Sequence, residues 1–398
     1  GVRLVGSEMC IRDRTSPISI TKTHIIAISF LVGVGALIFN IMPILLAAIG
    51  IERAYSDTEL GDIGSAYFSG FTLFTVFAMV WVRRIDWRKS SITSLIVAAF
   101  LLALAAFIEN IALLLLAFAL LGIAMVFIYT PLLTCLGDTA DPDRAMGFSL
   151  TLQVSLAAVV AFVLPTYVLP FFGLRGALMT LSLLCLLSLL LTPTIPRSGR
   201  FSAVGTPLWA GFTAIKNASR APKIALLGIL IFYIGITGLW TFVDRIAQSQ
   251  GLQADAIGLA ISASLLFGGV GALLPAILGA RFGRQLMLIL GLCTILGAIF
   301  LLSSVLTDLR FLFGVILLNV GWNMTVAYAA AQVAESDNTG FILPLIPAAI
   351  SIGAAIAPAL SGRLLEFGGS QSYFGVLTAI TVIAYALLII AIRAVPEE

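Results

Sequence analysis

Charged residues are scarce in this sequence. Lys, Arg, Asp and Glu make up only 10% of the 398 positions, whereas hydrophobic residues make up 60%. A water-soluble domain carries about 25% charged residues, because its surface must be hydrated. Since the mean hydropathy is also high, at +1.12, we expect lipid to be the main solvent of this chain.

Histidine and cysteine are also rare. The one histidine, His24, begins an apolar segment, and Cys135, Cys185 and Cys293 lie inside or at the ends of others, with no metal or disulfide spacing. Paired intramembrane carboxylates, a zinc-type H-E-x-x-H motif and a phosphate-binding G-x-x-x-x-G-K-[ST] loop are missing. We therefore expect no metal, no cofactor and no enzymatic activity. The net charge of +3, without a basic run, argues against a nucleic-acid partner.

What the sequence has in abundance is long apolar segments. Each is near the length of about 20 residues that crosses a hydrocarbon core of about 30 Å as a helix. Lipid offers no partner for free backbone amides, so membrane spans of this kind must be helical. The sequence predicts an all-α integral membrane protein with twelve spans: 24–49, 61–82, 91–108, 111–136, 147–171, 174–194, 223–246, 254–279, 285–306, 309–334, 340–364 and 372–394.

The basic residues are unevenly distributed between the two sets of loops. The loops on the side of the termini carry twelve: Arg83, Arg84, Arg88, Lys89, Arg144, Arg197, Arg200, Lys216, Arg220, Lys223, Arg281 and Arg284. The other loops carry five: Arg53, Arg175, Arg245, Arg310 and Arg363. Because cytoplasmic loops are enriched in Lys and Arg, we expect both termini in the cytoplasm of a bacterium, with the protein in its inner membrane.

The longest connector divides the chain in two. Residues 196–222 are rich in Pro, Gly, Ser and basic residues, and they separate a bundle over 23–195 from one over 223–398. The tail, 1–22, is expected to be disordered or artefactual. Its first part, 1–14, looks like translated adapter or vector sequence, and the alternative is a short cytoplasmic tail.

Several features of the first half recur in the second. Arg84 corresponds to Arg281, and Asp138 to Glu335, each at a shift of 197 residues. Similar short matches are 62–64 with 256–258 and 172–173 with 367–368. Since each half has six spans, both halves share one orientation, which predicts two pseudo-symmetric six-helix bundles about an axis along the membrane normal.

The loop motifs resemble those of the major facilitator superfamily. That family carries G-x-x-x-D-R-x-G-R-R/K between its second and third helices. Residues 280–285 read Ala-Arg-Phe-Gly-Arg-Gln, and residues 83–89 keep the basic positions but lose the Asp and the Gly. Residues 142–147 also look like the family's loop after helix four. The family's drug–proton antiporters usually place an Arg in helix four, and here 111–136 carries no charge, so proton antiport is permitted but not indicated.

The resemblance implies that helices one, four, seven and ten line a central cavity. Polar and aromatic side chains on these helices are the candidate solute site: Asn40, Tyr129, Tyr233, Thr237, Trp240, Asn319, Trp322 and Asn323. We expect the last three to face the central axis together. The alternative is that the amides only join helices, at around 0.6 kcal/mol each, and that Trp240 belongs to an interfacial aromatic belt.

The resemblance also implies a gate on the cytoplasmic side. We expect Arg84 to lie near Asp138 and Arg281 near Glu335, with Gly283 and Arg284 completing the motif in the second half. The alternative is that these arginines only set the topology. Asp244 is expected to pair with Arg245 at the end of its helix, or else to couple transport to protons.

Together these features predict a secondary transporter that works by alternating access. Export of a metabolite or drug-like compound is our first expectation. Facilitated uptake of a sugar or other metabolite, or a membrane sensor or scaffold without transport, are the alternatives. The lack of mid-membrane charge favours a neutral, amphipathic or polyhydroxylated solute. We expect a monomer whose partners are that small solute, the lipid bilayer and H+ as the candidate coupling ion.

Overall fold

The computed structural model describes residues 21–139, 142–199, 219–278, 281–336 and 345–394. Nearly all of these residues are helical. The helices of the first half are α2 (Lys22–Asn40), α3 (Met42–Arg53), α4 (Asp57–Val76), α5 (Ala78–Trp81), α6 (Trp87–Ala105), α7 (Ile111–Gly137), α8 (Pro142–Val163), the π-helix η1 (Leu164–Val168), α9 (Leu169–Ser188) and the 3₁₀ helix η2 (Leu189–Thr194). Those of the second half are α11 (Arg220–Ser249), α12 (Ala254–Leu278), α13 (Arg284–Ser303), α14 (Asp308–Ser336) and α15 (Ile346–Arg393).

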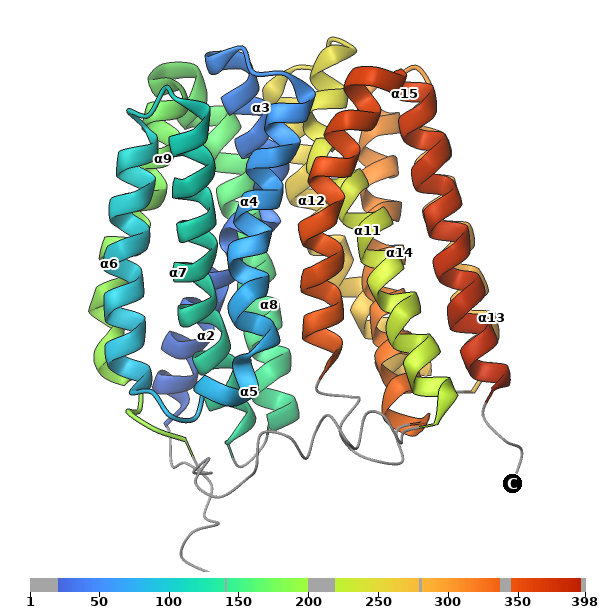
Figure 1. Ribbon diagram of the computed structural model, residues 1–398, viewed down its shortest axis with the longest axis horizontal. Helices are drawn as coiled ribbons and strands as arrows, with labels where there is room; N and C mark the ends of the chain where they lie inside the picture. Colours follow the sequence, from blue (N-terminus) through green and yellow to red (C-terminus); the bar gives the residue numbers. More distant parts are fainter. Residues whose placement is uncertain (1–20, 140–141, 200–218, 279–280, 337–344, 395–398) are drawn as a thin grey trace, which may run out of the picture.

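These segments form the predicted twelve membrane helices. Nine helices in the described ranges are long and apolar enough to cross a bilayer, and two of them each contain two spans. The chain reverses inside those two, at Gly173 and Gly369, whose φ angles of +61° and +67° favour glycine. The remaining span is α4, which is less apolar and begins with Asp57 and Glu59. Figure 1 shows the first half, blue to green, beside the second half, yellow to red.

Side-chain caps set where several helices begin. Ser56 and Glu59 form a capping box at the start of α4, each side chain bonding the other residue's backbone N–H. Asn110 accepts hydrogen bonds from the N–H groups of Ala112 and Leu113 and so starts α7. The reversals between spans are therefore short, and consecutive helices lie antiparallel.

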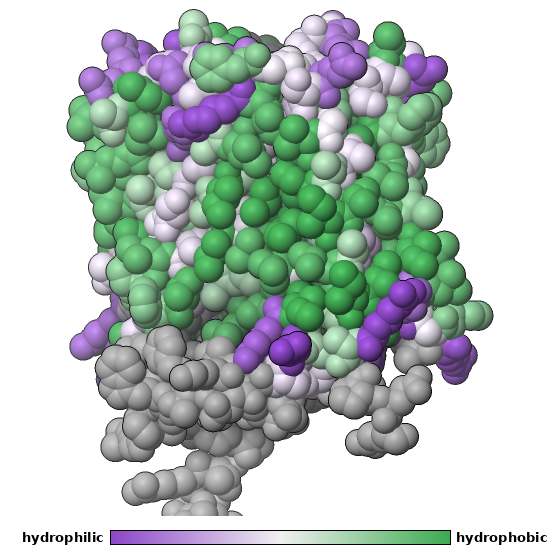
Figure 2. All heavy atoms as spheres, turned by 45° about the vertical axis from the view of Figure 1, so that its right-hand side comes forward, coloured by the Kyte–Doolittle hydropathy of each residue, from purple (hydrophilic) through white to green (hydrophobic). Residues whose placement is uncertain are grey.

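The two ends of the bundle differ in what they carry. Lys22 and Arg393 lie at one end, which we name the terminal face, and the short turns after Arg53 and at Gly173 and Gly369 lie at the other, the far face (Figure 1). In Figure 2 a broad hydrophobic band separates hydrophilic groups at the two ends. Such a band is what a lipid-facing surface requires.

The two halves meet along two seams related by the internal repeat. In one, Gly61 of α4 packs on the Pro358 carbonyl of α15, so that an added Cβ would overlap the oxygen. In the other, a Cβ on Gly258 of α12 would lie 2.6 Å from Cγ of Pro165 in η1. Gly61 and Gly258 stand 197 positions apart. The same kind of contact, a glycine packed against a proline, thus closes both seams.

A serine one turn further along each helix repeats the pattern. The hydroxyl of Ser65 accepts the backbone N–H of Ala359 at 2.9 Å, and that of Ser262 donates to the carbonyl of Ala158 at 2.9 Å. Ser65 and Ser262 are again 197 positions apart. Small residues allow this close approach, which is how helices associate in lipid.

Candidate functional site

Four aromatic rings meet between the halves, and we name them the aromatic centre: Phe39 of α2, Tyr233 and Trp240 of α11, and Trp322 of α14. The ring of Trp322 lies 5.9 Å from Phe39, 5.8 Å from Tyr233 and 6.3 Å from Trp240, measured between centroids. These are ordinary distances for tilted or edge-to-face pairs. Trp322 thereby connects the second half to the first at the middle of the molecule.

Two buried polar groups in α11 belong to the same region. Neither Thr237 Oγ1 nor Trp240 Nε1 has a hydrogen-bond partner within the described part of the chain. Both residues are almost fully buried. Since a buried polar group without a partner is costly, these two atoms are suited to bond a solute or water.

Asn319 has hydrogen-bond partners within the second half, and its predicted place in the solute site stays a prediction. Its amide donates to Ser264 Oγ at 3.1 Å and to the Val315 carbonyl at 3.2 Å, and the residue is 3% exposed. It therefore joins α14 to α12 inside the second half. Asn323 is half-buried, bonds the Asn319 carbonyl and lies against Gly268 of α12. Both amides thus lie against Gly268, whereas Trp322 contacts aromatic rings of α2 and α11.

Asn40 and Tyr129 lie on the first half. Asn40 ends α2, where the helix is interrupted at Ile41, and its amide bonds the Ala36 carbonyl at 2.9 Å. Tyr129 of α7 is half-buried, and its ring lies 5.9 Å from that of Phe71. Whether either residue contacts a solute stays a prediction.

Charged side chains join the halves at the far face. Arg245 of α11 forms an ion pair with Asp57 of α4. Arg363 of α15 pairs with Asp62 of α4 at 2.8 Å. The carboxylate of Glu366 also accepts the backbone N–H of Thr58 at 2.8 Å. We name these three the far-face contacts, and they join the beginning of α4 to α11 and α15 of the second half.

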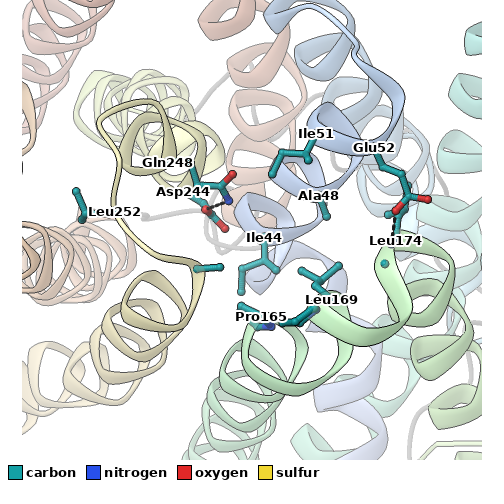
Figure 3. A pocket seen from close by; sticks show the side chains of 13 residues that line it. Ile44, Ala48, Ile51, Glu52, Pro165, Leu169, Leu174, Asp244, Gln248 and Leu252 are labelled. Atoms are coloured by element: carbon teal, nitrogen blue, oxygen red, sulfur yellow. Dashed lines mark hydrogen bonds between the residues drawn. The ribbon is translucent and has the colours of Figure 1, made fainter.

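The expected pairing of Asp244 with Arg245 is wrong. These neighbours point in different directions along α11, and Arg245 is used by Asp57. Asp244 is 3% exposed and accepts a hydrogen bond at 2.6 Å from the neutral amide of Gln248. It faces a cavity of about 420 Å³ at the far face, between α3, η1, α9 and α11 (Figure 3).

On the terminal face, Asp138 pairs with Arg83 and not with Arg84 as predicted. Two guanidinium nitrogens of Arg83 lie 2.9 and 3.0 Å from the two carboxylate oxygens. Asp138 is 3% exposed, while Arg84 is exposed. The pair lies within the first half, where it ties the loop after α5 to the end of α7.

The second predicted pair cannot be placed, because the side chain of Glu335 lies outside the described residues. Arg281 is exposed in the turn before α13. Gly283 has φ of +76° and precedes Arg284, the first residue of α13. A side chain at Gly283 would be strained, which accounts for the glycine in this motif. The contact of Arg281 with Glu335 stays a prediction.

Sequence reasoning missed two features of this region. Phe39 joins the aromatic centre, but a phenylalanine in an apolar span carries no signal of its own. Asp57 and Asp62 were visible as charges, yet their partners stand in the other half, 188 and 301 positions away. Within the described residues, no cluster of three or more His, Cys, Asp or Glu side chains could hold a metal ion.

This architecture, with two six-helix bundles that meet along two seams, defines an integral membrane protein with an internal repeat. The family model of the Major Facilitator Superfamily matches residues 25–242 and again 225–398. The chain belongs to the Major Facilitator Superfamily, as its loop motifs predicted. It is a multi-pass membrane transporter, and its cargo in the broad sense is a small molecule.

Two solved structures illustrate the likeness of fold. One is a bacterial homologue of the human lysosomal transporter Spinster, inward-facing and unoccupied, with a TM-score of 0.70, 14% identity, and coverage of 94% of this chain and 97% of that one. The other is a mutant of the nucleoside transporter NupG, with a TM-score of 0.77, 12% identity, and coverage of 92% and 99%. Among curated proteins, no sequence matches this chain significantly.

Proposed function

We propose that this transporter exports a small amphipathic solute by alternating access, with the aromatic centre as its solute site. The observation that supports this most is the position of Trp322, which touches aromatic rings on both halves. Flat rings provide apolar surface for a solute, and the unpartnered Thr237 and Trp240 atoms can fix its orientation. A solute bound there would contact both halves, so its contacts would change when the halves separate.

The far-face contacts suit the role of an outer gate. Asp57, Asp62, Arg245 and Arg363 are all partly exposed. Exposed ion pairs contribute only about 0–1 kcal/mol each. A gate has to open during each cycle, so contacts of this size can close the far face without trapping it.

The membrane placement that accompanies this proposal follows from the basic loops. The terminal face would be cytoplasmic, the membrane a bacterial inner membrane, and the protein a monomer. The proposed transport cycle requires only the solute and the two faces, and H+ is its candidate coupling ion.

Flux into proteoliposomes tests the proposal. Purified protein is reconstituted and offered a panel of nucleosides, sugars, neutral drug-like compounds and organic amines, with and without an imposed pH gradient. We expect saturable flux of at least one amphipathic compound, preferentially toward the far face. Flux of sugars alone, in either direction without a gradient, would favour facilitated uptake. Binding without flux of any compound would favour a sensor.

A further inference from the structure

The far-face cavity is acidic at its polar positions and apolar elsewhere. Its charged lining groups are Asp244 of α11 and Glu52 of α3, and the other polar side chain is the neutral Gln248. The walls are formed by apolar residues, among them Ile44, Ile51, Pro165, Leu169, Leu174 and Leu252. Figure 3 shows Asp244 and Gln248 on one side of the space and Glu52 on the other.

The two carboxylates differ in how they are satisfied. Glu52 is exposed, and its carboxylate accepts the backbone N–H of Leu174 at 2.6 Å. Asp244 is 3% exposed, and it accepts a hydrogen bond from the Gln248 amide, which carries no charge. A buried carboxylate without a cation is costly, because neutral hydrogen bonds replace only part of its hydration.

The guanidinium of the adjacent residue, Arg245, is already engaged. Arg245 follows Asp244 directly but forms its ion pair with Asp57, and its NH1 lies close to Gly50 of α3. The elements η1 and α9 contribute prolines, leucines and a glycine to the lining, and the α11–α12 turn contributes Leu252 and Ala254. The charged groups near Asp244 are therefore Glu52 and Arg245. None of the described side chains that line the cavity is basic.

The aromatic centre lies next to the cavity, on the side away from the far face. Trp240 precedes Asp244 by four residues on α11, so the two share one face of the helix, one turn apart. Aromatic faces attract cations, with the strongest effect for tryptophan. A solute with a positive charge and an apolar body would thus meet matching chemistry in the cavity and on the path below it.

We propose that the far-face cavity binds a small organic cation with an apolar body, and that the Asp244 carboxylate is its counter-ion. This deepens the proposed transport function, because it names the solute class. When the organic cation leaves, a proton on Asp244 neutralises the same carboxylate. The two then compete for one group, and falling pH on the far side weakens binding of the organic cation.

Calorimetric titration of the full chain in detergent tests this with benzyltrimethylammonium, whose charge is permanent. We expect saturable binding near neutral pH that weakens as the pH falls. Asp244→Asn should weaken it by about tenfold or more, the loss of one charge interaction. N-benzylacetamide, similar in size but uncharged, should bind at least about tenfold more weakly than the cation.

Asp255→Asn is the matched control, because Asp255 is an exposed carboxylate at the same face and outside the cavity lining. The Asp255→Asn variant should bind benzyltrimethylammonium with the same affinity as the unchanged chain. Equal affinity in Asp244→Asn, or an equal loss in both variants, would overturn the proposal. If Asp244→Asn fails to fold, Leu252→Trp fills the cavity from the turn and should also abolish binding. Unchanged binding in Leu252→Trp would place the cation elsewhere. Since binding is measured without flux, either failure leaves the transport proposal standing.

Discussion

At the scale of single residues, Trp322 contacts three other aromatic rings between the halves. It belongs to the second half, yet its ring reaches Phe39 of the first. The same ring contacts Tyr233 and Trp240 on a neighbouring helix of its own half. Removing it would open space at the point where a solute is expected to bind.

Trp322→Ala should therefore reduce flux of an identified solute by at least about tenfold, the loss expected when a large ring leaves a binding site. Expression and thermal stability should change little by comparison with flux. Phe300→Ala is the control, since Phe300 is 73% exposed on α13. Proteoliposome flux of both variants gives the measurement, and equal flux in the two would argue against the aromatic centre as the site.

The ion pair of Asp57 with Arg245 makes a second residue-scale prediction. Asp57→Arg should open the far face, because two like charges would then meet. We expect an impermeant maleimide, added at the far side, to label a Thr237→Cys reporter up to about fivefold faster, the factor that corresponds to about 1 kcal/mol. The native cysteines are first replaced by serine.

Combining Asp57→Arg with Arg245→Asp restores opposite charges. The labelling rate should then return toward that of the unmodified reporter. A double variant that labels as fast as Asp57→Arg alone would show that the pair does not hold the far face closed.

The candidate site illustrates what residue patterns can predict. The spacing of Tyr233, Thr237 and Trp240 placed them on one face of a helix, and the structure brings the two aromatic residues to Trp322. The same reasoning did not predict the hydrogen bond of Asn319 with Ser264, because an amide with a partner on another helix looks identical in sequence to one without. The sequence also did not show which of the adjacent residues Arg83 and Arg84 pairs with Asp138.

At the scale of helices, the two seams depend on glycines that face a proline or its carbonyl. Replacing Gly61 by alanine should push α4 away from α15, since the added Cβ would overlap the Pro358 carbonyl, and backbone cannot move aside cheaply. We expect Gly61→Ala to increase far-side labelling of the reporter, and Gly258→Ala to do the same at the other seam.

Gly269→Ala is the control for both, because nothing lies within 4 Å of its added Cβ. It should label like the parent. A similar rise for Gly269→Ala would point to a general loosening of the fold and not to closure of the seams.

The two reversals at Gly173 and Gly369 form another matched pair. Both have positive φ with ψ near 180°, a region that costs other residues about 1–3 kcal/mol. Gly173→Ala should lower the thermal unfolding temperature more than Gly369→Ala, because its Cβ would also lie 2.8 Å from the Glu52 carboxylate, whereas Gly369 has open space. Thermal unfolding in detergent measures both.

Gly375→Ala serves as the helical control, with a normal φ and open space around the added methyl group. It should be neutral or stabilising by up to about 1 kcal/mol. Equal melting temperatures for Gly173→Ala and Gly369→Ala would contradict the role given to Glu52.

The helices themselves were largely predictable, because a run of about 20 apolar residues has few options in lipid. Their ends were less so. The predicted spans 340–364 and 372–394 left the reversal of the second half anywhere between them, and the chain turns there at Gly369. Neighbouring glycines offer the same freedom, and only the packing of the adjoining helices selects between them.

At the scale of the whole molecule, the orientation in the membrane is the prediction that the basic loops carry. Reporter fusions after residue 205 and after residue 398 should both read as cytoplasmic, because the loops on that side carry the excess of Lys and Arg. An alkaline phosphatase reporter active at either point would invert the assignment of the two faces.

The two seams share a glycine pattern. The two ion pairs between the halves that the structure describes both lie at the beginning of α4, which they join to α11 and α15, while the cavity lies beside the other seam. Exposed charges are screened over about 8 Å at physiological ionic strength and over shorter distances in stronger salt. Salt in the external medium should therefore loosen one side of the closure and spare the other. Concentrated salt would weaken the ion pairs at the beginning of α4 and allow the halves to separate there, while the other seam stayed closed. A transporter built in this way would register the salinity outside the cell.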